Sequence, residues 1–155
     1  MNIINNEKVQ EFSRFEFKYI LNEKLRKEVE NQVQNFMKYD GYVHPEYDNS
    51  YFVRSLYFDS PRSFNFYEKI DGIKKRKKFR IRTYDKKYNN SALFIEQKGR
   101  NVNRVFKSRA PIKKNNLEKF YNANNFDELI DSYSEVKIIQ EFVIDSVKRK
   151  ISPVV

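Results

Sequence analysis

Cationic side chains recur on alternate residues in several short runs that otherwise hold Phe, Ile, Leu or Tyr. In a β-strand, residues two apart point to the same face, so each run would line one face with charge and the other with apolar groups. Cations crowded on one rigid face repel one another unless an anion lies between them. The pattern therefore indicates a surface that binds a polyanion. Its cationic members are Arg14, Lys18, Arg76, Lys78, Arg80, Arg82, Lys98, Lys107 and Arg109.

The run from Lys74 to Arg82 has the highest density of positive charge. Phe79 and Ile81 would anchor this strand in a core. Arg80 and Arg82 would then project together from the other face, where their guanidinium forks match the oxygens of phosphate groups. We therefore interpret the pair as phosphate ligands. Two simpler explanations are a solvated edge strand whose charges prevent aggregation, and a patch that binds nucleic acid.

Two carboxylates, Glu16 and Glu96, each lie two residues from a lysine on a charged face. A structural salt bridge to neighbouring cations would explain both positions. Alternatively, the two side chains would be oxygen ligands for Mg²⁺ or Mn²⁺, which bind proteins through a few carboxylates together with substrate phosphates. Both interpretations fit the sequence.

Residue usage excludes several kinds of catalytic site. The chain has no Cys, and its one histidine, His44, lies beside Pro45 in a predicted loop, so no Cys/His or Ser/His/Asp set can be assembled. A zinc site is unsupported for the same reason. The sequence also lacks the glycine motifs of P-loop and Rossmann nucleotide sites.

The composition is that of a basic, folded domain. The chain has 155 residues, of which 39% are hydrophobic and 16% aromatic, and this is enough to build one core. Its formal net charge of +10 predicts attraction to phosphate-rich partners. Residues 1–11 form a polar arm without the apolar stretch of a secretory signal, and no apolar run approaches the ~20 residues of a membrane span. We therefore expect one domain over residues 1–155, located in the cytoplasm.

Hydrophobic periodicity predicts an alternation of strands and helices. The predicted strands are 12–21, 51–59, 75–84, 92–98 and 104–110, with another that starts at Ser152. The predicted helices are 23–38, 62–70, 117–121, 126–130 and one that follows Ser134. Asn22 should cap the first helix, whose buried stripe would be Leu25, Val29, Val33, Phe36 and Met37. The predicted turn residues between strands are Asp85, residues 89–91 and Gly99.

A series of sequence motifs runs along most of these elements. The motif segments are residues 14–19, 53–61, 67–72, 76–84, 94–98 and 107–109. Their order and spacing resemble the VTC domain of polyphosphate polymerases, a branch of the triphosphate tunnel metalloenzymes, also called the CYTH superfamily. The resemblance extends over roughly residues 12–112 and is specific because the motifs occur together and in the family's order.

The resemblance implies an α+β fold in which an antiparallel β tunnel with flanking helices binds the triphosphate of a nucleotide or a growing polyphosphate. It also implies a divalent cofactor, Mn²⁺ or Mg²⁺, with Glu16 and Glu96 as its candidate ligands. The candidate catalytic residues in the lumen are Lys18, Arg80, Arg82 and Lys98. The candidate ligands for substrate phosphates are Arg14, Arg76, Lys78, Lys107 and Arg109.

The reaction implied by the resemblance is transfer of the γ-phosphoryl group of ATP to a polyphosphate chain, with release of ADP. Two alternatives are a triphosphate hydrolase or cyclase of the same superfamily, and a non-catalytic module that binds polyphosphate or inositol phosphate. The expected partners are ATP or another triphosphate and inorganic polyphosphate; no specific nucleic acid is expected, and no membrane-protein partner is deduced. Family members continue with further strands beyond the position of Val155, so we expect the chain to hold the N-terminal two-thirds of the family domain and an incomplete tunnel.

Overall fold

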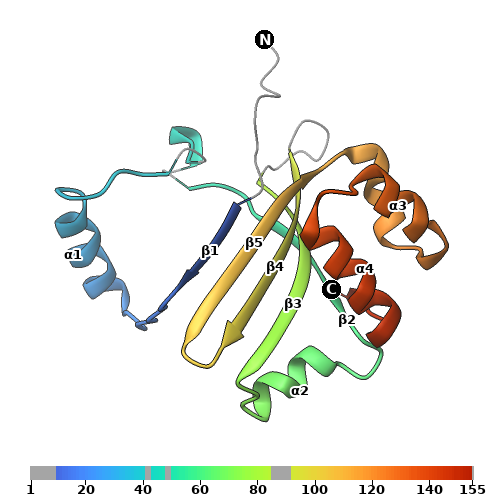
Figure 1. Ribbon diagram of the computed structural model, residues 1–155. Helices are drawn as coiled ribbons and strands as arrows, with labels where there is room; N and C mark the ends of the chain where they lie inside the picture. Colours follow the sequence, from blue (N-terminus) through green and yellow to red (C-terminus); the bar gives the residue numbers. More distant parts are fainter. Residues whose placement is uncertain (1–9, 41–42, 48–49, 85–91, 155) are drawn as a thin grey trace. The chain divides into compact units, whose positions relative to one another are not determined.

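The computed structural model describes residues 10–40, 43–47, 50–84 and 92–154 (Figure 1). The turns predicted at Asp85 and at residues 89–91 lie outside the described residues. The chain divides into two compact units. The sheet unit comprises Met1–Phe15 and Val53–Val155, and the helical unit comprises Glu16–Phe52.

The sheet unit is built on one antiparallel six-stranded sheet with the order β1-β5-β4-β3-β2-β6. Its strands are β1 (Gln10–Arg14), β2 (Arg54–Asp59), β3 (Lys75–Thr83), β4 (Leu93–Asn101), β5 (Arg104–Ile112) and β6 (Ser152–Val154). Among the described residues the edge strands β1 and β6 do not pair with each other, so the sheet is open. The predicted α+β class, with an antiparallel sheet and flanking helices, is confirmed, and the sheet does not close into a tunnel.

The hydrophobic core lies on one face of this sheet. Helical segments from the second half of the unit pack against that face (Figure 1): η2 (Lys114–Phe120), η3 (Ala123–Asn125), α3 (Phe126–Ser132) and α4 (Lys137–Arg149). Phe142 of α4 lies at the centre of the core, with its ring centroid 4.9 Å from that of Phe58 and 5.5 Å from that of Phe79. Because side chains alternate along a strand, the neighbours of Phe79 in β3 project from the opposite face.

The strand predicted at 12–21 is shorter in the structure, and this corrects the placement of two candidate residues. β1 ends at Arg14, which pairs with Val105, the second residue of β5. Beyond that point only Arg104 remains of the neighbouring strand, and an alternating sequence without a partner does not form a ladder. Glu16 and Lys18 therefore do not lie on a strand.

The first residue of β2 is likewise set by where the neighbouring strand ends. The strand predicted from residue 51 begins at Arg54, which pairs with Thr83, the last residue of β3. The helix that follows was predicted at 62–70, but α2 is Phe64–Ile70. Ser63 has a φ of 52°, in the left-handed region, which ends the helix on its N-terminal side.

The other helices of the sheet unit lie near their predicted positions with shifted ends. The helix predicted at 117–121 is the 3-10 helix η2, which starts at Lys114. The helix predicted after Ser134 begins at Lys137, and its capping residue is Val136. Gly99, predicted as a turn residue, instead lies within β4, where a Cβ atom would come 2.7 Å from the carbonyl oxygen of Arg76. Glycine is needed there for this close approach.

The helical unit contains α1 (Glu23–Val33) and the short helix η1 (Pro45–Tyr47). The predicted cap of α1 is confirmed, because Asn22 Oδ1 accepts a hydrogen bond from the backbone N–H of Leu25 at 2.9 Å. The predicted extension to residue 38 is wrong, since α1 ends at Val33. Within the described ranges of the whole chain, no helix is long and apolar enough to cross a membrane.

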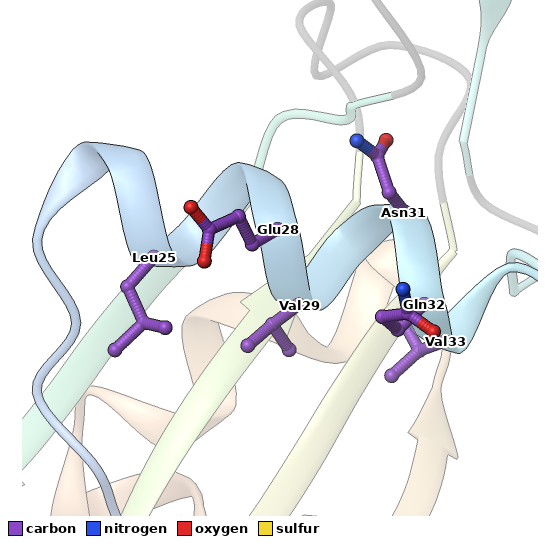
Figure 2. A pocket seen from close by; sticks show the side chains of 6 residues that line it. All are labelled: Leu25, Glu28, Val29, Asn31, Gln32 and Val33. Atoms are coloured by element: carbon purple, nitrogen blue, oxygen red, sulfur yellow. The ribbon is translucent and has the colours of Figure 1, made fainter.

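The apolar stripe of α1 is present but not buried, contrary to the prediction. Figure 2 shows Leu25, Val29 and Val33 beside an open pocket of about 480 Å³ on this helix. Phe36 and Met37, which were expected to continue the stripe, are exposed beyond the end of the helix. Helical periodicity determines which side of a helix is apolar, but another element has to cover that side. No described residue of the helical unit is buried.

Candidate phosphate-binding face

The face of the sheet opposite the core carries the alternating cations, and we call it the cationic face. On the three central strands it consists of Arg76, Lys78, Arg80, Arg82, Phe94, Glu96, Lys98, Arg100, Val105, Lys107, Arg109 and Pro111. The register aligns Lys78, Lys98 and Lys107 in one row across β3, β4 and β5. Neighbouring strands lie ~4.8 Å apart, and like charges directly opposite each other destabilise a sheet. Such a row is favourable only with negative charge close by.

Glu96 supplies one negative charge at the centre of the face. Its side chain is fully buried, with 0% exposure. Arg80 donates to Glu96 Oε2 from Nε at 2.7 Å and lies at 2.6 Å from the same oxygen through Nη2. Lys107 Nζ lies 2.8 Å from Glu96 Oε1, and Arg82 Nε lies 4.0 Å from Oε2. Three cations thus surround one carboxylate, and this cluster keeps an excess of positive charge.

The electrostatics of the cluster stabilise its charged forms. Burial alone would raise the pKa of Glu96, but the hydrogen bond from Lys107 and the positive charge of Arg80 outweigh burial and hold that pKa below its ordinary value. Burial likewise opposes the charge of Arg80, yet Glu96 raises the pKa of Arg80 overall. The carboxylate of Glu96 and the guanidinium of Arg80 therefore both remain ionised at neutral pH.

Aromatic side chains complete the face, and the contacts of Tyr57 in β2 with two of the cations were not predicted from the sequence. Tyr57 accepts a hydrogen bond from Arg80 Nη1 at 2.9 Å, and Lys78 Nζ lies 4.8 Å from the centroid of its ring. The guanidinium carbon of Arg109 lies 3.5 Å from the ring centroid of Phe94. These contacts hold long cationic side chains in fixed positions. The alternation of Ser and Tyr in β2 was the available sequence signal for Tyr57.

The core side of the sheet carries Lys77, whose charge is compensated in a different way. Lys77 of β3 lies 3.4 Å from a carboxylate oxygen of Glu141 and 3.3 Å from one of Asp145, both in α4. Gln97 also donates to Glu141, at 2.5 Å. A second pocket of about 480 Å³ lies among residues that include Glu11, Lys77 and Glu141, with charges of both signs. Charges of both signs therefore lie around Lys77, whereas positive charge predominates on the cationic face.

The structure brings most of the predicted site residues together. Arg76, Lys78, Arg80, Arg82, Glu96, Lys98, Lys107 and Arg109 all lie on the cationic face of β3, β4 and β5. Arg14 lies at the end of β1, opposite Val105, with its guanidinium carbon 4.9 Å from the ring centroid of Phe12. Glu16 and Lys18 belong to the helical unit, where Lys18 Nζ lies 3.4 Å from Glu16 Oε1.

The residues around Glu96 do not fit a divalent metal in this arrangement. Both carboxylate oxygens already face cations, Oε2 toward Arg80 and Oε1 toward Lys107. A metal ion would add positive charge to a cluster that already holds an excess of it. Among the described residues, moreover, no group of three or more His, Cys, Asp or Glu side chains could hold a metal ion.

Comparison with known proteins identifies the family of the chain. A search of curated proteins found no match for the chain. The family model described as VTC domain matches residues 13–155, which covers the six-stranded sheet except the first residues of β1, together with its helices and the cationic face. Because the match covers most of the chain, this protein is a member of the VTC domain family.

Proposed function

We propose that the cationic face binds the triphosphate of a nucleotide and the end of a polyphosphate chain, and that the protein transfers the γ-phosphoryl group of ATP to that end. The proposal rests on membership of the VTC domain family together with one observation. That observation is the excess of positive charge around Glu96, since Arg80, Arg82 and Lys107 face this one carboxylate on a rigid sheet face.

The chemistry of phosphoryl transfer suits such a face. An oxygen of the terminal phosphate of the chain attacks the γ-phosphorus of ATP, the bond from that phosphorus to the β,γ-bridging oxygen breaks, and ADP leaves. The protein has to align the two phosphates and neutralise their charge, and it needs no covalent nucleophile. In this proposal Arg82 and Lys98 bind the reacting phosphates, while Lys78 and Arg109 hold the rest of the chain.

A requirement for Mn²⁺ or Mg²⁺ remains part of the proposal. These ions bind mainly through substrate phosphates with one or two carboxylates, and when bound they neutralise phosphate charge. The described residues of the cationic face offer Glu96 as their central carboxylate, and that side chain is engaged by Arg80 and Lys107. We therefore assign no step of the reaction to the metal.

The proposal predicts that the chain, incubated with ATP and either Mn²⁺ or Mg²⁺, forms long-chain polyphosphate and ADP. Gel electrophoresis of the phosphate products and an assay for ADP measure the two products together. Release of single phosphates without chain growth would instead support a triphosphate hydrolase. Tight binding of polyphosphate that is independent of metal, without any product, would overturn the enzyme proposal and support a binding module.

A further inference from the structure

Two cations of the cationic face are already engaged by a group inside the protein. Arg80 uses Nε and Nη2 on Glu96 and Nη1 on the hydroxyl of Tyr57. Lys107 directs its ammonium group at the other oxygen of Glu96. These donor nitrogens are therefore engaged by groups of the protein itself.

The partner of these cations resembles a ligand in its chemistry. A carboxylate and a phosphate both offer planar pairs of oxygens to an arginine fork, and they make the same kind of charge-assisted hydrogen bonds. Glu96 lies in the middle of the face, opposite Arg80 on one side and Arg109 on the other. Its negative charge also repels any phosphate that approaches the face.

We propose that Glu96 is an internal counter-anion that competes with phosphate for Arg80 and Lys107, and so sets the affinity of the cationic face for polyanions. This inference rests on the proposed phosphate-binding role of the face. Glu96 is thus a positioning residue. It holds the side chains of Arg80 and Lys107 in place, and it lowers the affinity for polyphosphate enough for that polymer to dissociate.

The test compares tripolyphosphate binding by the intact chain and by Glu96→Gln, measured by titration calorimetry in the presence of EDTA. The substitution keeps the size of the side chain but removes its charge. Tripolyphosphate should bind the variant about tenfold more tightly or better, because a competing anion has been removed. Without ligand the melting temperature of the variant should fall, since Arg80 and Lys107 lose their counter-charge.

Glu141→Gln is the matched control. Glu141 also accepts a hydrogen bond in the sheet unit and faces a β3 cation, Lys77, but on the core side of the sheet. Its replacement should lower the melting temperature and change the tripolyphosphate affinity less than about twofold. An equal or weaker affinity of Glu96→Gln than of the wild-type chain would overturn the inference.

The outcomes for wild-type and variant proteins separate this inference from the proposed function. Binding by the wild-type chain without tightening in Glu96→Gln contradicts only the counter-anion role. Binding by Glu96→Gln alone supports the counter-anion role. If neither protein binds tripolyphosphate, both the counter-anion role and the proposed phosphate-binding function are contradicted. If Glu96→Gln is unfolded in buffer, tripolyphosphate should restore its native circular dichroism spectrum by replacing the lost negative charge. Failure of the polyanion to restore that spectrum also contradicts the inference.

Discussion

Arg80→Ala is expected to lower the free energy of unfolding by about 3–5 kcal/mol, because it leaves a fully buried carboxylate without its main partner. Glu96 would lose two charge-assisted contacts, at 2.7 and 2.6 Å, and would keep Lys107. The hydroxyl of Tyr57 would lose its donor as well. Such a loss is a large share of the stability of an ordinary domain. Urea denaturation followed by circular dichroism measures it.

The structure offers two controls for this prediction. Arg82→Ala should cost only about 1 kcal/mol, since Arg82 donates to Ser55 at 3.0 Å and lies 4.0 Å from Glu96. Adding Glu96→Gln to Arg80→Ala should recover part of the loss, because the orphaned charge is then removed. If Arg80→Ala proved as stable as Arg82→Ala, the conclusion that Arg80 is the main partner of the buried Glu96 carboxylate would be wrong.

Arg82→Ala is expected to weaken tripolyphosphate binding about tenfold or more while the fold survives. Arg82 engages Ser55 through Nε, and among the described residues its two terminal nitrogens have no hydrogen-bond partner. They are therefore available to a phosphate, and loss of a hydrogen bond to a charged group costs about 1.5–3 kcal/mol. Titration calorimetry with tripolyphosphate in EDTA measures the affinity without any contribution from metal.

Lys75→Ala is the control for net charge in this experiment. Lys75 lies on the same strand, is exposed, and projects from the core side of the sheet. Its removal also subtracts one positive charge, but tripolyphosphate affinity should change less than about threefold. Equal losses in Lys75→Ala and Arg82→Ala would mean that binding depends only on overall charge, and an unchanged affinity in Arg82→Ala would exclude Arg82 as a ligand.

The central strands could be predicted because the residues that alternate in the sequence are also the residues that have a neighbouring strand to pair with. β3 lies between β2 and β4, so the alternation at 75–84 is matched by a ladder along nearly its whole length, and the strand ends one residue early at Thr83. The same alternation at 12–21 fails beyond Arg14 because β5 starts beside it. The local sequence shows which side chains share a face of the strand, and the extent of the neighbouring strand determines how long the paired strand is.

The arrangement of the charges could not be predicted, because it depends on register. The sequence placed Arg80 and Glu96 on charged faces, and it left a salt bridge and a metal site equally open for Glu96. Pairing of Arg80 with Glu96, and of Lys78 with Lys98, follows from the alignment of β3 with β4. A shift by two residues would keep every side chain on its face and change every charge pair. Register therefore determines which chemistry the face can perform.

The most direct test of the phosphate-binding face measures which lysines tripolyphosphate protects from acetylation in the wild-type chain. Mass spectrometry quantifies modification of each lysine by an amine-reactive acetylating reagent, with and without the polyanion. Protection should be concentrated at Lys78 and Lys98 on the cationic face, while Lys75 and Lys137 react as before. Equal protection of all four lysines, or protection confined to Lys75 and Lys137, would contradict the assignment of the cationic face as the phosphate-binding site.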